Sequence, residues 1–164
     1  MAPIVNTIGT AANVGGGLTK SGAGVLTLSG ANTYTGATVV NAGTLHLDAT
    51  GTLAGSASLS LASGATLQLD TNISLNDDIV LTLAGGSNLN LNFDGSLGAE
   101  TIRGLVVGST TFGPGTYATS DLNGFGVTVT GAGSLTVLQA VPEPSVVALF
   151  GLGMAASLLR RRRK

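Results

Sequence analysis

The sequence predicts an all-β protein built as a parallel β-solenoid with coils of about 20–23 residues. Three observations carry this prediction. Short runs alternate apolar and polar residues with the period of two that a half-buried strand requires. The runs recur at nearly regular intervals, each with a glycine just before it. Glu and Lys, which favour helices, are almost absent from the body of the chain.

The spacing of leucines within these runs favours stacked coils. We align Leu26, Leu45, Leu67, Leu89 and Leu135, whose separations are 19, 22, 22 and 46 residues. A period of this size is typical of a solenoid, in which each coil buries its apolar face only against its neighbours. A β-sandwich of antiparallel hairpins shares the alternation and is the alternative fold.

The alternation also predicts which side chains enter the core. Segments 37–40, 58–61, 79–83 and 126–129 are strand-like and supply the other sides of the coils. Polar residues at equivalent positions are expected to form an outward ladder along the solenoid. The expected ladder is Thr27, His46, Gln68, Asn90 and Thr136. The expected core is Leu26, Leu28, Leu45, Leu47, Leu59, Leu61, Leu67, Leu69, Leu81, Leu83, Leu89, Leu91 and Phe93.

Residues 17–47 resemble a known repeat unit. The likeness rests on Gly-Leu-Thr-Lys-Ser-Gly-Ala-Gly-Val-Leu-Thr-Leu-Ser-Gly-Ala-Asn-Thr-Tyr-Thr-Gly at 17–36 and Val-Asn-Ala-Gly-Thr-Leu at 40–45. This stretch is similar to the autotransporter-associated β-strand repeat, also called the passenger-associated transport repeat. The resemblance implies a right-handed β-helix on an exported bacterial protein. It implies no catalytic activity.

The expected solenoid spans residues 17–138, after an irregular segment or partial coil at 1–16. The Pro-Gly and Gly-Thr-Tyr steps within 112–117 are turn signals that should end the regular coils. The residues that follow are then expected to form a cap or a last coil, because a terminal repeat must shield the end of the core. A surface loop with a buried Tyr117 is the alternative interpretation.

Charge and composition exclude several functions. Residues 1–141 contain two basic and seven acidic groups, a formal charge of −5, which argues against a nucleic-acid partner. The sequence contains no Cys, so disulfides and thiolate metal sites are excluded. No cofactor motif is present, since Gly15-Gly16-Gly17 is not followed by the Lys-Ser/Thr of a phosphate loop.

No residue set predicts a catalytic or metal site. His46 is the only histidine, and we interpret it as an exposed strand residue without a positioned acid or nucleophile. Asp77 and Asp78 do not match the spaced ligands of a calcium-binding repeat and are expected at a solvated corner. The chain is therefore predicted not to be an enzyme. A polysaccharide lyase would require clustered charged residues that the body lacks.

The C-terminal residues read as a sorting signal. Pro142 and Pro144 restrict the backbone, so the linker at 139–144 should be extended and readable by an enzyme. Residues 145–159 form an apolar run, expected as one hydrophobic transmembrane helix of roughly 22 Å. That is short against a hydrocarbon core of about 30 Å, which suits a transient anchor. The positive-inside rule places the final basic cluster in the cytoplasm, namely Arg160, Arg161, Arg162, Arg163 and Lys164.

This order of motif, helix and basic end resembles the PEP-CTERM sorting signal of Gram-negative bacteria. The resemblance implies that an inner-membrane exosortase, a protease, reads Pro142, Glu143 and Pro144. It also implies that the protein resides briefly in the inner membrane and then reaches the cell surface or extracellular matrix. Residues 1–7 lack the features of a signal peptide, so we expect the printed sequence to begin inside a longer protein.

Two functions follow as expectations. The first is an exported, non-enzymatic surface or matrix β-solenoid protein, with exopolysaccharide as a further partner to be tested. The second is a polysaccharide-binding or adhesin module that uses the polar ladder. The 4% aromatic content argues against strong stacking on sugars.

Overall fold

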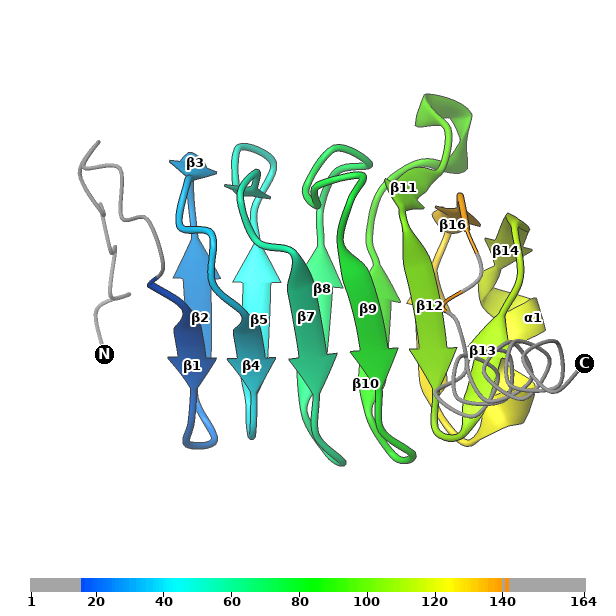
Figure 1. Ribbon diagram of the computed structural model, residues 1–164, viewed down its shortest axis with the longest axis horizontal. Coiled ribbons are helices and arrows are strands. Elements are labelled where there is room, and N and C mark those ends of the chain that lie inside the picture. The colour runs from blue at the N-terminus through cyan, green and yellow to red at the C-terminus, as the bar shows by residue number, and fades with distance from the viewer. Residues whose placement is uncertain (1–15, 140, 142–164) are drawn as a thin grey trace, which may run out of the picture.

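The chain winds into a β-solenoid whose coils stack along one axis (Figure 1). The structure is a computed structural model, and it describes residues 16–139 and residue 141. Strands of successive coils pair in parallel, with leucine beside leucine: Leu45 lies opposite Leu67, and Leu67 lies opposite Leu89. The predicted solenoid is confirmed, and the antiparallel sandwich is excluded.

One side of the solenoid is a six-stranded sheet with the order β1-β4-β7-β9-β12-β13. Its first five strands run parallel, and β13 turns back antiparallel to β12. The strands are β1 (Leu18–Lys20), β4 (Thr38–Val40), β7 (Ser58–Leu61), β9 (Val80–Leu83), β12 (Gly104–Val107) and β13 (Thr110–Phe112).

A second side is a five-stranded, all-parallel sheet with the order β15-β10-β8-β5-β2. This sheet carries the outward ladder that the sequence predicts. Its strands are β2 (Val25–Leu28), β5 (Thr44–Leu47), β8 (Thr66–Leu69), β10 (Asn88–Leu91) and β15 (Thr128–Gly131).

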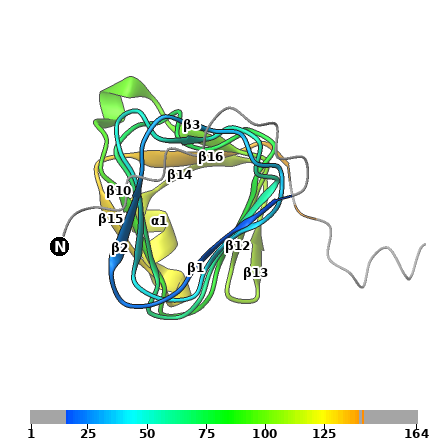
Figure 2. The same cartoon turned by 90° about the vertical axis from the view of Figure 1, so that its left-hand side faces the viewer.

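Two separate small sheets form the third side, and the end-on view in Figure 2 shows the resulting three-sided outline. β3 pairs with β6 in parallel, and a single bridge from Leu53 to Leu75 extends this side by one coil. Further along, β16 lies between β11 and β14. The strands are β3 (Ala31–Asn32), β6 (Thr52–Leu53), β11 (Glu100–Ile102), β14 (Gly115–Ala118) and β16 (Ser134–Val137).

Columns of aliphatic side chains fill the interior between the three sides. Twelve of the thirteen expected core residues are buried. Leu26 is the exception and is half-buried. Its strand, β2, is the last of its sheet, so among the described residues no further strand packs over it. The alternation thus identifies the inward positions correctly, while the position in the stack decides how deeply each one is buried.

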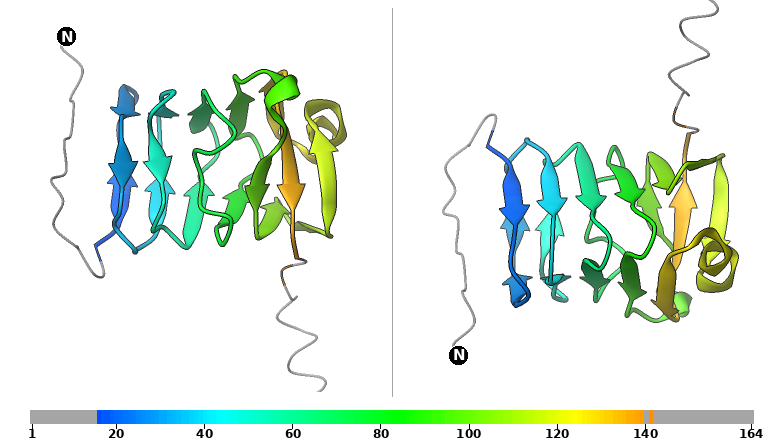
Figure 3. Two further views of the ribbon diagram at one scale, coloured as in Figure 1. Left: turned by 90° about the horizontal axis from the view of Figure 1, so that it is seen from above. Right: turned by 90° about the horizontal axis from the view of Figure 1, so that it is seen from below.

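The C-terminal end departs from regular coiling. After the antiparallel β13, the chain forms β14, the short helix α1 (Thr119–Leu122) and the 3₁₀ turn η2 (Asn123–Phe125), which Figure 3 shows from above and below. The ring of Phe112 packs edge-to-face against the rings of Tyr117 and Phe125, and its centroid lies 5.1 and 4.9 Å from theirs. Leu122 is fully buried beneath these turns. Residues 112–117 lie where the chain leaves the regular coil path, but β15 and β16 then pair in parallel with β10 and β11, so a last coil follows them. Tyr117 is half-buried.

This irregular end corrects one part of the predicted repeat. Leu135 does not follow Leu89 in the leucine column; Val129, in β15, holds that place. Leu135 lies in β16, opposite Glu100 of β11. The separation of 46 residues fitted two regular coils by coincidence, because the chain between β10 and β15 makes three short helical turns and the four strands β11 to β14 instead.

Residues 1–15, 140 and 142–164 lie outside the part of the chain that the structure describes. The expected hydrophobic helix at 145–159 and the basic residues 160–164 fall there. Among the helices of residues 16–139, none is both long and apolar enough to span a membrane.

Candidate functional site

The outer face of the five-stranded sheet carries a polar ladder in exact parallel register. Thr27 lies opposite His46, His46 opposite Gln68, and Gln68 opposite Asn90. Paired strands are about 4.8 Å apart, so the ladder presents one polar side chain at each such step. Four of the five expected ladder residues are therefore brought together.

Thr136 is the ladder residue that the prediction placed wrongly. It lies in β16 on the third side, where Thr101 is its parallel neighbour and Thr116 Oγ1 is 2.9 Å from its own Oγ1. Thr130 of β15 occupies the fifth position, opposite Asn90. The error follows from the same irregular end that displaced Leu135, since both residues were assigned by counting coils.

A second polar row runs beside the first, two residues earlier on each strand. Asn88 Nδ2 lies 3.5 Å from Thr66 Oγ1 in the neighbouring coil, at the long limit of a hydrogen bond. Valine begins the row at the N-terminal end, and the remaining members are hydroxyl or amide residues. The row is Val25, Thr44, Thr66, Asn88 and Thr128.

Asp70 binds two ladder side chains, His46 and Gln68, and Asn92 beside them at one edge of this face. Its Oδ2 accepts a hydrogen bond of 2.7 Å from His46 Nε2. Its Oδ1 accepts bonds from Gln68 Nε2 at 3.0 Å and Asn92 Nδ2 at 3.1 Å. About a quarter of each side chain in the His46–Asp70 ion pair is exposed, so the pair stays open to solvent. The cluster links three successive coils.

The electrostatics of Asp70 favour its ionised form. Partial burial raises the pKa of this carboxyl, but the hydrogen bonds from Gln68, His46 and Asn92 outweigh burial and hold the pKa below its ordinary value. Sequence reasoning left His46 without partners. Only the stacking of β5 on β8 brings Asp70 beside it, 24 residues along the chain. The prediction that no acid is positioned beside His46 was wrong, because neighbours across coils depend on register.

The arrangement supports recognition better than reaction. Both carboxylate oxygens of Asp70 accept hydrogen bonds from the cluster. Among the described residues, no serine or threonine is bonded to His46 as a nucleophile would be. Within residues 16–139, no group of three or more His, Asp and Glu residues could hold a metal ion. The face offers rows of hydroxyls and amides that can donate and accept hydrogen bonds.

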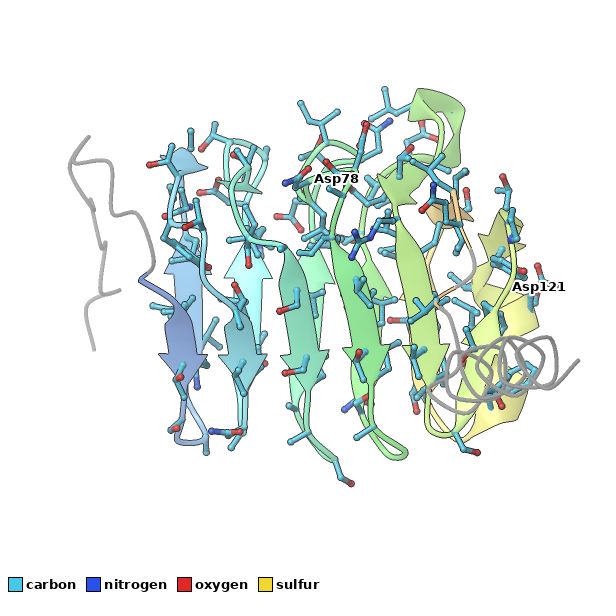
Figure 4. All side chains as sticks on the ribbon, in the orientation of Figure 1. Asp78 and Asp121 are labelled. Atoms are coloured by element: carbon cyan, nitrogen blue, oxygen red, sulfur yellow. The ribbon has the colours of Figure 1, made fainter. Side chains whose placement is uncertain are left out.

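The other candidate carboxylates serve turns. Asp78 and Asp121 lie at distant parts of the surface (Figure 4). The backbone amide of Asp78 binds Asn76 Oδ1 at 3.0 Å, and both Asp77 and Asp78 are exposed at a corner, as predicted. Asp121 Oδ2 accepts a 2.8 Å bond from the backbone amide of Ala118 at the start of α1.

The region that resembles the repeat unit holds polar side chains that join coils. Lys20 is buried, and its Nζ donates to the carbonyls of Gly22 at 2.6 Å and Ala42 at 2.9 Å. Asn32 Nδ2 donates to Gly30 O and, in the next coil, to Thr52 O, both at 3.1 Å. Each of these side chains satisfies backbone acceptors of two successive coils.

A buried chain of hydroxyl groups also joins successive coils, and it begins in the turn between β3 and β4. Tyr34 OH lies 2.8 Å from Thr38 Oγ1, which lies 3.1 Å from Ser56 Oγ. Ser56 Oγ donates to Gly36 O at 2.9 Å. Burial raises the pKa of Tyr34 although its bond to Thr38 opposes the rise. These residues explain why a repeat unit of this composition stacks: its polar groups bind the neighbouring coil.

Two family models match segments of the chain. The passenger-associated-transport-repeat matches residues 18–47, the region of Lys20, Asn32 and Tyr34. The PEP-CTERM protein-sorting motif matches residues 140–164. The chain carries a passenger-associated-transport-repeat and a PEP-CTERM protein-sorting motif. Both resemblances noted in the sequence are thereby confirmed. Pro142, Glu143 and Pro144, which the sequence predicts as recognition residues, lie outside the described residues.

Part of the chain is also similar to a curated protein. The chain is 48% identical over 50 residues to the adhesin BmaC autotransporter of Brucella suis biovar 1 (strain 1330). The alignment covers 30% of this chain and 2% of that adhesin, so this chain spans only a small part of the relative's length. No solved structure matches the chain significantly.

Proposed function

We propose that this protein is an exported, non-enzymatic component of the cell surface or extracellular matrix of a Gram-negative bacterium. The single observation that carries the proposal is the sorting motif at residues 140–164 following a β-solenoid. The repeat at 18–47 and the similarity of 50 residues to a protein named an adhesin autotransporter support the same destination. Several polar side chains of the described body bind turns and neighbouring coils, as Lys20 and Asn32 do, which supports a structural role.

The sorting step is assigned to the C-terminal residues. An exosortase reads Pro142, Glu143 and Pro144 in the linker 139–144. Residues 145–159 hold the chain in the inner membrane while Arg160–Lys164 remain in the cytoplasm. The solenoid at 17–138 then lies on the far side of the membrane. The abrupt change from an acidic body to a run of five basic residues supports this orientation.

Fractionation of a tagged full-length chain tests the sorting step. We expect the tag at the cell surface or in the medium for the unaltered chain, and retention in the cell for a chain that lacks residues 142–164. A second variant, Glu143→Gln, keeps the apolar run and the basic end. This variant distinguishes recognition of the motif by the exosortase from insertion into the membrane, because the protein should insert but remain uncleaved. Unchanged surface delivery of both variants would refute the proposal.

The in-register ladder favours a second candidate function, the binding of a polysaccharide as an adhesin module does. Hydroxyl and amide side chains repeat at each strand of β2, β5, β8 and β10, as sugar hydroxyls repeat along a glycan. The ionised Asp70 fixes the orientation of Gln68 and His46 at one edge. An extended polar chain lying across the strands would meet a similar set of partners at every coil.

Pull-down with purified exopolysaccharide tests this second function. The double variant Gln68→Ala and Asn90→Ala should lose at least tenfold in retention. Its matched control, Ser60→Ala and Thr82→Ala, removes the outward polar residues of β7 and β9 on the other sheet. Equal retention of both variants, or no retention of the unaltered chain, would count against the ladder as a glycan site.

A further inference from the structure

A carboxyl group without a cationic partner is buried where two coils meet. Glu100, in β11, is 1% exposed. Its Oε1 accepts a hydrogen bond of 2.9 Å from the backbone amide of Leu75, and its Oε2 accepts one of 3.0 Å from that of Ser74. Within residues 16–139 no cation forms an ion pair with it. The two amides are thus its partners across the coil boundary.

These two amides belong to the corner 71–76, which connects β8 to β9. Ser74 is itself buried and donates through Oγ to Thr71 O at 3.1 Å. Asn72 Nδ2 donates at 2.7 Å to the carbonyl of Leu97, in the adjoining 3₁₀ turn η1 (Gly95–Leu97). Both turns carry exposed apolar side chains, since Ile73 is 68% and Leu97 is 60% exposed. Glu100 therefore anchors a corner that presents apolar surface.

The charges around Glu100 oppose its ionisation. The neighbouring strand β16 presents Leu135 opposite it and contains no titratable residue, nor does β6. Asp77 and Asp78 follow the corner 71–76, and Asp94 precedes η1, all of negative sign. Arg103, just after β11, is exposed and forms no ion pair with Glu100. Burial raises the pKa of Glu100 to about 7; the amides of Leu75 and Ser74 oppose the rise, and Asp77 adds to it.

We propose that Glu100 is a proton-controlled latch, which holds the corner 71–76 closed in mildly acidic medium and releases it in alkaline medium. A neutral carboxyl can stay buried while its carbonyl oxygen still accepts an amide hydrogen. When the proton leaves to water, a charge remains in a site where no cation of residues 16–139 pairs with it. Opening then becomes more favourable, because water can solvate the carboxylate. Release changes the apolar surface that Ile73 and Leu97 form.

The sign of the effect follows from linkage. A carboxyl with a raised pKa in the closed state binds more protons than in the open state, so closing is favoured at low pH. The free energy that favours the closed corner is fully present below the ordinary pKa of 4.5, which the open state has, and it is lost as the pH rises through the closed-state pKa of about 7. For these two values, the opening equilibrium constant increases about 30-fold between pH 5.5 and pH 8.5.

Hydrogen exchange of the full chain measures this opening. Protection factors, corrected for the intrinsic pH dependence of exchange, should fall about 30-fold at Ser74 and Leu75 between pH 5.5 and pH 8.5. Amides of Leu67 and Leu89, in the neighbouring strands of the five-stranded sheet, should keep theirs. Constant protection at Ser74 and Leu75 over this range would overturn the proposal.

Two variants identify the group responsible. Glu100→Gln cannot ionise, so protection at Ser74 and Leu75 should become independent of pH. Asp78→Asn removes an exposed charge from the same corner and should retain the full pH dependence. A direct titration of the Glu100 carboxyl by ¹³C NMR in the unaltered chain requires no variant to fold. A midpoint below pH 5, or the unaltered pH dependence in Glu100→Gln, would refute the latch.

Discussion

Single side chains in the repeat region act mainly on the backbone of the next coil. Lys20 and Asn32 each donate to carbonyl oxygens of two coils. Ser29 Oγ similarly donates to Asp48 across a coil boundary. A buried carbonyl without a partner is costly, so these contacts fix how the coils stack. The repeat therefore contributes to the stability and the register of the stacked coils.

Replacement of Lys20 tests the importance of one such contact. Lys20→Met keeps an unbranched apolar side chain but removes the donor to Gly22 O and Ala42 O. We expect the free energy of unfolding to fall by about 1–3 kcal/mol, the usual cost of leaving buried polar groups unpaired. Arg103→Met removes the other cation of the described body, which is exposed, and should change stability by less than about 0.5 kcal/mol. Urea denaturation of both variants measures the difference; equal effects would contradict this role for Lys20.

Asp48 provides a pH-dependent test of a coil contact. Hydrogen bonds, first from Ser29 and then from the amide of Thr50, lower the pKa of Asp48 to about 2. A carboxyl with a lowered pKa stabilises the fold above its unfolded value and loses this effect as the pH falls from about 4 through about 2. We expect the Tm of the unaltered chain and that of Asp48→Asn to converge over this range. Parallel Tm curves, or additive effects of Ser29→Ala and Asp48→Asn in a double-mutant cycle, would disprove the contact.

At the scale of strands, the sequence predicts positions within a regular coil well and neighbours across coils poorly. Alternation around Leu45, Leu67 and Leu89 identifies inward and outward faces, because the period of two is a local property of a strand. The partner of His46 and the true fifth ladder residue, Thr130, depend on register and on the length of the irregular end. Neither can be predicted from the residues that surround it in the sequence. The burial of Glu100 likewise arises only when β11 packs on a corner 25 residues earlier.

Close stacking of the coil corners predicts unequal effects of two glycine replacements. A Cβ at Gly51 would lie 2.2 Å from the backbone oxygen of Leu28, in the preceding coil, so one of the two coils must shift. We expect Gly51→Ala to cost about 1–3 kcal/mol, as overpacking does. A Cβ at Gly85, also in a turn, meets nothing within 4 Å. Gly85→Ala should be neutral or stabilising by up to about 1 kcal/mol. Thermal unfolding compares the two, and a harmless Gly51→Ala would show that the corners are not closely stacked.

At the scale of the whole molecule, one continuous column of side chains links all coils. Each coil contacts only its neighbours, so stability is approximately a sum over adjacent interfaces. The two ends differ. Antiparallel strands, α1 and the Phe112 cluster close the C-terminal end, whereas β1 and β2 are the last described strands of their sheets at the other end. Position along the stack should therefore determine how much a core side chain contributes.

Two leucines of the same column test this dependence. Leu67 is fully buried between Leu45 and Leu89, so Leu67→Ala leaves a cavity and should cost about 2–5 kcal/mol. Leu26 begins the column and is half-buried, so Leu26→Ala removes less buried surface and should cost clearly less. Urea denaturation of the full chain gives both values, and hydrogen exchange shows whether the loss spreads beyond β2. If Leu26→Ala cost as much as Leu67→Ala, the end at β2 would have to be covered in the full protein, and the column would extend beyond the described coils.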